Sequence, residues 1–256
     1  MKQRLLSAFG VFCKIAAVLA VPYASTAQIT VITSGGFLTA YEELRPKFEK
    51  ANHLTIATLR GASQGPGPNT IGALLRAGAH ADVVIMSRDG LDELIAEGKI
   101  APGTQVDLAR VPLGVAVRAG AARPDISTVE AFKQTLLRAR SIGVQSTSAI
   151  YMTTKLLPKL GIADAISKKL NSGGAPAIAA GETEIAVLPV SELLNKPGVD
   201  LIGTIPAEIQ LVQLFSAAVL VGSKEPRLSR QLIAFLASED ARGAIRASGM
   251  EPVGSR

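Results

Sequence analysis

The residues best suited to chemistry in this chain are a hydroxyl and two glycines, Ser34, Gly35 and Gly36, which directly follow the apolar run 29–33. A turn of this kind between a strand and a helix leaves backbone N–H groups without partners at the positive end of the helix dipole. Glycine also lets a ligand approach the backbone closely. The pattern is typical of a site for a small oxyanion or a carboxylate.

Short turns of small residues follow three further apolar runs, and the carboxyl ends of parallel strands meet at one edge of a sheet. We therefore expect these turns to line one cleft, although small residues in turns also serve simply as turn formers and helix caps. The predicted ligand-binding residues are Ser34, Gly35, Gly36, Arg60, Ser63, Ser146, Thr147, Ser148, Pro189 and Val190.

Arg60 stands out because it is a cation at the point where an apolar strand meets a glycine-rich turn. Its planar guanidinium matches the shape of a carboxylate or a phosphate. The alternative is an ordinary surface arginine in a salt bridge. The Gly/Pro-rich segment 64–69 that follows either shapes a wall of the cleft or is an ordinary loop.

Residues for proton transfer or metal binding are scarce at the predicted strand ends. No His, Glu or Asp is expected to face the cleft unless Asp89 or Glu192 turns toward it, so the pattern favours binding over acid–base catalysis and we predict no catalytic residue. His53 and His80 lack the spacing of metal ligands, and we expect neither a metal nor a cofactor.

The first 27 residues resemble a cleaved signal peptide, which predicts a periplasmic protein. They contain Lys2, Arg4 and Lys14, no acidic residue, two short apolar runs, and small residues at 25–27. Each apolar run is too short to span a bilayer.

Removing residues 1–27 leaves 24 basic and 21 acidic residues, a net charge of +3 that is no footprint of a nucleic-acid-binding protein. Cys13 is the only cysteine, so the remaining chain has no disulfide or thiol chemistry. We expect a monomer.

Apolar runs of strand length alternate with helical patterns along the chain, which predicts an α/β fold with parallel sheets. The alternation starts afresh near residue 111, and this restart indicates a second lobe.

Several segments resemble the molybdate-binding (ModA-like) family of periplasmic solute-binding proteins: TVITSGGF, LLRAGAHADVVIMS, SAIYMTTKLLPKLGI, ETEIAVLPVSELL and LIAFLASEDARGAIRASGMEP. The resemblance implies an α/β, two-lobed periplasmic binding protein type 2 fold with a ligand cleft between the lobes. It places two crossover strands near 111–117 and 211–219. Lobe one is then 28–110 plus 212–256, and lobe two is 111–211.

The same resemblance implies a protein that captures a small anion for an ABC-type importer. The family's site serines map onto Ser34 and Ser63, and its backbone donor maps onto Ser148. Pro189 or Val190 replaces a tyrosine that usually ends the later strand. Arg60 has no counterpart in the molybdate binders, which favours a carboxylate over molybdate.

A looser resemblance, in SGGF and DLARVPLGVAVRAGAARPDIST, is to the periplasmic aconitate isomerase branch of the same superfamily. It implies the alternative function, a cofactor-free isomerase of a tricarboxylate. The sequence leaves binder and isomerase open.

Overall fold

The computed structural model describes residues 28–254, so the predicted signal peptide lies outside the described residues. The strands are β1 (Gln28–Thr33), β2 (Thr55–Arg60), β3 (Val83–Ser87), β4 (Val106–Arg118), β5 (Ile142–Gly143), β6 (Leu170–Asn171), β7 (Ile185–Pro189), β8 (Val199–Thr204), β9 (Val212–Val219) and β10 (Glu251–Pro252).

The helices alternate with these strands. They are α1 (Gly35–Asn52), α2 (Ile71–Arg76), α3 (Arg88–Ala96), α4 (Val129–Arg138), α5 (Ser146–Tyr151), the π-helix η1 (Met152–Leu156), α6 (Leu157–Lys159), α7 (Ala163–Ser167), α8 (Ala175–Ala180), α9 (Val190–Leu193), the 3₁₀-helix η2 (Ala207–Ile209), α10 (Pro226–Leu236) and α11 (Glu239–Ala247). None of the helices within residues 28–254 combines the length and apolar character that a membrane span requires.

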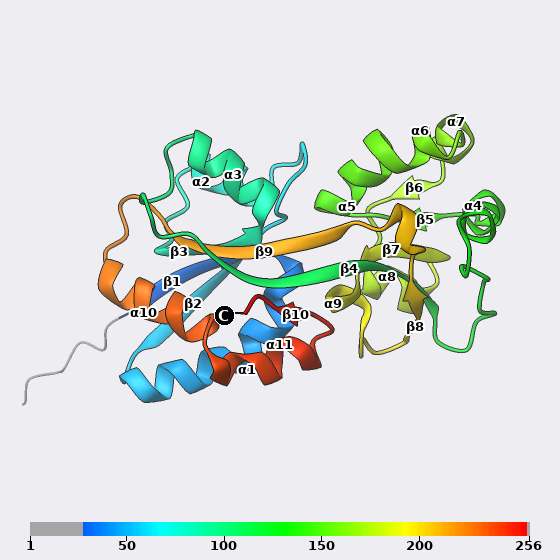
Figure 1. Cartoon of the computed structure of the whole chain (residues 1–256). Helices are drawn as coiled ribbons and strands as arrows, with labels where there is room; N and C mark the ends of the chain where they lie inside the picture. The colour runs from blue at the N-terminus through cyan, green and yellow to red at the C-terminus, as the bar shows by residue number, and fades with distance from the viewer. Residues whose placement is uncertain (1–27, 255–256) are drawn as a thin grey trace, which may run out of the picture.

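The molecule has two lobes joined by two connections, the long strand β4 and the return of the chain into β9 near the predicted second crossover (Figure 1). The first part of β4, Val106–Pro112, pairs with β9, and its second part, Leu113–Arg118, pairs with β7 and β8. We call the half built on β2-β1-β3-β9-β4 lobe one and the half built on β4-β7-β5-β6 lobe two. The predicted α/β class is confirmed, and β4 crosses between the lobes where the restart of the pattern placed a crossover.

Alternation along the strands of lobe one sends side chains to both faces of its sheet. Ile29 and Val31 pack in the core formed with α1, α10 and α11, whereas Ile32 packs in the core formed with α2 and α3. Helices therefore cover both faces, and the five residues of β3 are all buried. This burial explains its continuous apolar sequence.

Lobe two has the same layered design. Leu113 and Val115 of β4 pack with α4, η1 and α6, and Ala116 packs on the other face with α8 and α9. Helix α5 runs into the π-helix η1, which is a geometry often found near functional sites. Five residues of this segment line the space between the lobes: Ser146, Thr147, Ala149, Ile150 and Thr153.

A buried carboxylate, Asp82, links several segments of lobe one at the start of β3. Asp82, just before β3, accepts hydrogen bonds from the backbone N–H of Thr30 (2.8 Å), the hydroxyl of Ser223 (2.9 Å) and the backbone N–H of Lys224 (2.7 Å). Burial alone raises the pKa of Asp82, but these hydrogen bonds together lower it below its ordinary value. Asp82 thus ties β1 and β3 to the loop that precedes α10.

Candidate ligand-binding cleft between the lobes

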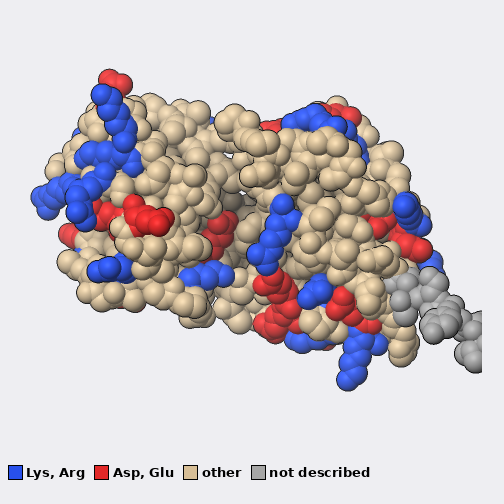
Figure 2. Space-filling model, turned by 180° about the vertical axis from the view of Figure 1, so that it is seen from behind, with Lys and Arg blue, Asp and Glu red and all other residues tan. Residues whose placement is uncertain are grey.

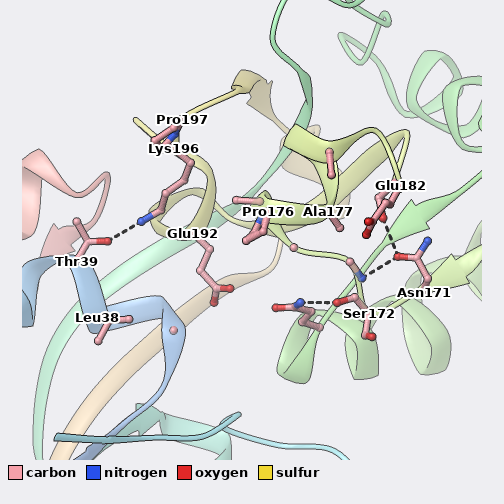
Figure 3. Close-up of a pocket in the computed structure, with 17 residues that line it drawn as sticks. Leu38, Thr39, Asn171, Ser172, Pro176, Ala177, Glu182, Glu192, Lys196 and Pro197 are labelled. Atoms are coloured by element: carbon pink, nitrogen blue, oxygen red, sulfur yellow. Dashed lines mark hydrogen bonds between the residues drawn. The ribbon is translucent and has the colours of Figure 1, made fainter.

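The space between the lobes forms two connected chambers, and Figure 2 shows the hollow between the two halves from behind. The inner chamber, about 660 Å³, has walls from the segment 61–70 of lobe one and from α5 of lobe two. The outer chamber, about 1200 Å³, lies between the start of α1 and the segment 171–183 (Figure 3). Gly35, Gln145, Ser172 and Glu192 line both chambers.

Two buried polar side chains in the inner chamber have no hydrogen-bond partner among the described residues. They are the hydroxyl of Ser34, which is 3% exposed, and the amide nitrogen of Gln213, which is 5% exposed. Ser34 is the N-cap residue of α1 but makes no side-chain capping bond, and the first turn of α1 contains no acidic residue. Buried polar groups are rarely left unpaired, so both groups are available to a ligand at the positive end of α1.

The two glycines after Ser34 serve different purposes. A Cβ on Gly36 would lie 2.1 Å from Cζ of Phe215, so only glycine lets this turn pack against the β9 ring. A Cβ on Gly35 would lie 3.3 Å from the carboxyl carbon of Glu192. Gly35 lines the cleft, whereas Gly36 does not, and its role is to bring the helix end close to β9.

The Gly/Pro-rich loop forms one wall of the inner chamber, as one of the two sequence hypotheses proposed. Ser63 at its start is buried, and its hydroxyl accepts a hydrogen bond from the backbone N–H of Ser87 (2.9 Å). Ser63 therefore lines the cleft while its side chain also holds the loop on β3.

Direct hydrogen bonds join the lobes at two sides of the cleft. The backbone N–H of Gln64 donates to the hydroxyl of Ser146 (2.9 Å), and the hydroxyl of Thr147 lies 3.0 Å from that of Ser87. On the other side, Lys196 Nζ donates to the Thr39 hydroxyl (2.9 Å; Figure 3).

Ser146 adopts a left-handed backbone conformation with φ of 50°. Such strain in a residue other than glycine is often found at ligand sites. Ser146 and Thr147 both line the inner chamber.

Three other predicted residues divide between cleft and core. Pro189 lines the inner chamber. Ser148 is fully buried, and its hydroxyl accepts a hydrogen bond from the backbone N–H of Gln145 (3.3 Å) in a capping box at α5 and donates to the backbone oxygen of Gln145 (2.7 Å). Val190 packs into the core of lobe one. The side chains of Ser148 and Val190 are thus used structurally and are not among the residues that line the chambers.

Arg60 does not face the cleft, which corrects the placement expected from the sequence. Its exposed side chain forms an ion pair with Glu42 of α1. Thr58, two residues earlier on β2, hydrogen-bonds to Tyr41 of the same helix (2.9 Å). Residues i and i+2 of a strand share a face, so Arg60 is on the face of β2 that α1 covers.

Glu192, in α9, lies in the cleft, and it is one of the two acidic residues that the sequence analysis named as able to turn toward it. It reaches the boundary of the two chambers from lobe two (Figure 3). Burial raises the pKa of Glu192 to about 7, and Lys196 opposes this shift only in part. The strand ends therefore do carry a group that exchanges a proton near neutral pH.

Gln213 is a residue of the cleft that the sequence analysis missed. It is a polar side chain at a buried position of β9, between strands of apolar character. The sequence did contain a signal for Gln213, because it is a polar amide within the otherwise mostly apolar run 212–219. Residues 28–254 contain no group of three or more His, Cys, Asp or Glu side chains placed to hold a metal ion.

The model of the bacterial extracellular solute-binding protein family matches residues 29–251. The chain belongs to this family. The recognition of a ModA-like solute-binding protein is thereby confirmed.

This solute-binding protein is also similar to a curated aconitate isomerase from Pseudomonas sp, at 36% identity over 230 residues and 88% of each chain. Among solved structures it is similar to the periplasmic molybdate-binding protein of Azotobacter vinelandii (18% identity, TM-score 0.69, covering 89% of this chain and 100% of the other). It is also similar to the sulfate-binding protein SubI of Mycobacterium tuberculosis H37Rv (16% identity, TM-score 0.69, 89% and 88%). These two likenesses establish the two-lobed fold.

Proposed function

We propose that this protein is a periplasmic solute-binding protein that captures a small organic anion and delivers it to an ABC-type importer. The observation that carries the proposal is a pair of unpartnered buried groups in a cleft walled by both lobes, Ser34 at the N-terminal end of α1 and Gln213 of β9. Hydrogen-bond donors at a helix N-terminus favour an anionic group.

The size of the cleft favours an organic acid over a tetrahedral oxyanion. The inner chamber alone has about 660 Å³, within the usual range for pockets that hold organic ligands. Arg60 gives no support to this choice, because it lies outside the cleft. The binding residues that we propose are Ser34, Gly35, Ser63, Ser146, Thr147, Pro189, Glu192 and Gln213.

Capture would use closure of the two lobes about β4, which changes sheet between Pro112 and Leu113. Hinge closure around a ligand needs contacts that only the closed state provides. The hydrogen bonds between Gln64 and Ser146 and between Lys196 and Thr39 are contacts of this kind. We further propose that residues 1–27 direct export to the periplasm and that the protein acts as a monomer with a membrane importer.

The test is a binding screen of the chain from residue 28 against molybdate, sulfate, dicarboxylates and tricarboxylates. A ligand at 100 times its dissociation constant stabilises the folded state by about 2.7 kcal/mol, which a thermal-shift assay detects. Titration calorimetry of Ser34→Ala should show weaker binding by roughly 5- to 30-fold. Ser127→Ala, at an exposed position outside the cleft, is the matched control. Failure of every acid to bind would contradict the proposal.

A second candidate function, isomerisation of a tricarboxylate, is favoured by Glu192. Shifting a double bond requires a base that takes a proton from the carbon beside a carboxylate and returns it to the other end of the allylic system. A carboxylate whose pKa is near neutral suits this role. Incubation with cis- or trans-aconitate, followed by NMR, tests it: the other isomer should form with the wild type and not with Glu192→Gln. If no isomer forms, the protein is a binder alone.

A further inference from the structure

Glu192 lies where the inner and outer chambers meet, beside Gly35. Both carboxylate oxygens are 3.4 Å from the point that a Cβ on Gly35 would occupy, so Glu192 of lobe two approaches the end of α1 in lobe one. Figure 3 shows the carboxylate directed into the space between the lobes, without a hydrogen bond to the residues drawn. A ligand at the end of α1 therefore contacts Glu192.

The charges around Glu192 do little to neutralise a second negative group. The described residues that line the inner chamber include no Lys, Arg or His. Lys196 lines the outer chamber, where its ammonium group donates to Thr39, and Glu182 lies on the wall of that chamber (Figure 3).

Helix α9 packs against α1, β4, β7 and β8, and parts of these elements carry no charge. The segments 113–117 of β4 and 185–189 of β7 carry no ionisable side chain, and neither does the first turn of α1. Asp200 of β8 accepts a hydrogen bond from the backbone of Gly120 (3.1 Å). An anion in the inner chamber and an ionised Glu192 would thus repel each other, and Lys196, whose ammonium group is held by Thr39, offsets that repulsion only in part.

We infer that Glu192 binds the ligand in its protonated form and donates its O–H to an oxygen of the anion, so that the anion enters the cleft together with one proton. The inference rests on the proposed function, because it needs an anionic ligand at the end of α1. Glu192 then joins Ser34 and Gln213 as a third hydrogen-bond donor. An ionised carboxylate offers only acceptors and would face the ligand oxygen without a hydrogen.

The energetics agree in direction. Burial already raises the pKa of Glu192 to about 7 in the ligand-free protein, and a bound anion raises it further because like charges disfavour ionisation. Above pH 7 the free protein must take up a proton on binding, and the affinity should fall by up to about 10-fold per pH unit. Below pH 6 the proton is already present, and the affinity should be constant.

The experiment is titration calorimetry with trans-aconitate at pH 6, 7 and 8, in buffers of different ionisation enthalpy, which reports the number of protons taken up. The wild type should take up 0.5 to 1 proton at pH 8, as an order-of-magnitude expectation from linkage. Glu192→Gln keeps a donor without the charge. It should bind within about 3-fold of the wild type at pH 6, with no proton uptake and little pH dependence. Glu208→Gln, outside the cleft, should behave as the wild type does.

Binding without proton uptake, or with proton release, would overturn the inference while leaving the proposed function intact. Loss of binding by Glu192→Gln at pH 6 would also overturn it, because Glu192 would then act as an ionised acceptor. If neither the wild type nor Glu192→Gln binds trans-aconitate or any other acid of the screen, the proposed function fails and the inference fails with it.

Discussion

Two carboxyl groups in this protein, the buried Asp82 and the partly buried Glu192, are tuned in opposite directions. Asp82 accepts several hydrogen bonds that favour its ionised form, whereas Glu192 faces a cleft with no such donors. The difference in surroundings, and not the residue type, sets the charge of each group near neutral pH. Each group therefore affects stability at a different end of the pH range.

Replacing Asp82 by Asn should destabilise the protein by about 1.5–3 kcal/mol at pH 7, because an amide cannot accept the same set of hydrogen bonds. The lowered pKa means that the wild-type contribution is present above the ordinary pKa of Asp and is lost as the pH falls below about 4. Urea denaturation at pH 7 and pH 3 measures both effects. Equal stability of Asp82→Asn and wild type at pH 7 would contradict the prediction.

Replacing Glu192 by Gln should have the opposite pH signature in the ligand-free protein. A pKa raised above the unfolded value stabilises fully below about pH 4.5, and this stabilisation is lost as the pH rises to about 7. Relative to wild type, Glu192→Gln should therefore gain about 1–3 kcal/mol between pH 4.5 and pH 8, allowing for partial solvation in the cleft. Denaturation curves of both proteins at these two pH values provide the measurement. The prediction is wrong if the difference in unfolding free energy between Glu192→Gln and the wild type is the same at pH 4.5 and pH 8.

At the scale of elements, the helix–strand contact between α1 and β9 depends on a single missing methyl group. Gly36→Ala should cost about 1–3 kcal/mol, because the new Cβ would overlap the ring of Phe215. Gly243→Ala, in α11 with open space around it, is the control and should stabilise by about 0.5–1 kcal/mol. Thermal unfolding compares the two variants. If Gly36→Ala is as stable as Gly243→Ala, then Phe215 and β9 can shift to accommodate the new methyl group at little cost, and the prediction is wrong.

The elements were largely predictable from the sequence, because apolar strands alternate with helices and small residues mark the turns between them. The face of a side chain was less predictable. The side chain of Arg60 lies on the face of β2 that α1 covers, where it pairs with Glu42. The sequence alone does not show which face of the sheet that helix covers. Gln213 became recognisable only when two lobes were brought together, since it belongs to no strand-end turn. Glu192 follows the end of β7, and the sequence named it only as a residue that could turn toward the cleft.

At the scale of the whole molecule, the contacts between lobes set the balance between open and closed states. Thr147→Val removes the hydroxyl that lies between Gln64 (2.9 Å) and Ser87 (3.0 Å) of lobe one. Ligand affinity should fall by roughly 3- to 10-fold, because the closed state loses a hydrogen bond.

Thr154→Val is the control for this change. Its hydroxyl is exposed and bonds to the backbone oxygen of Ile150 within the same helical segment (2.7 Å). Calorimetric titration of both variants with the ligand found by the screen measures the effect. Equal affinities for the two variants would show that the Thr147 contact does not contribute to closure.

The position of β9 between β3 and β4 has a consequence for biogenesis. The sheet of lobe one stays interrupted, with two unpaired strand edges, until residues 212–219 arrive from near the end of the chain. Pairing over such sequence distances is slow compared with local helix formation. A chain whose last third is still emerging from a ribosome or a translocation pore therefore cannot complete lobe one.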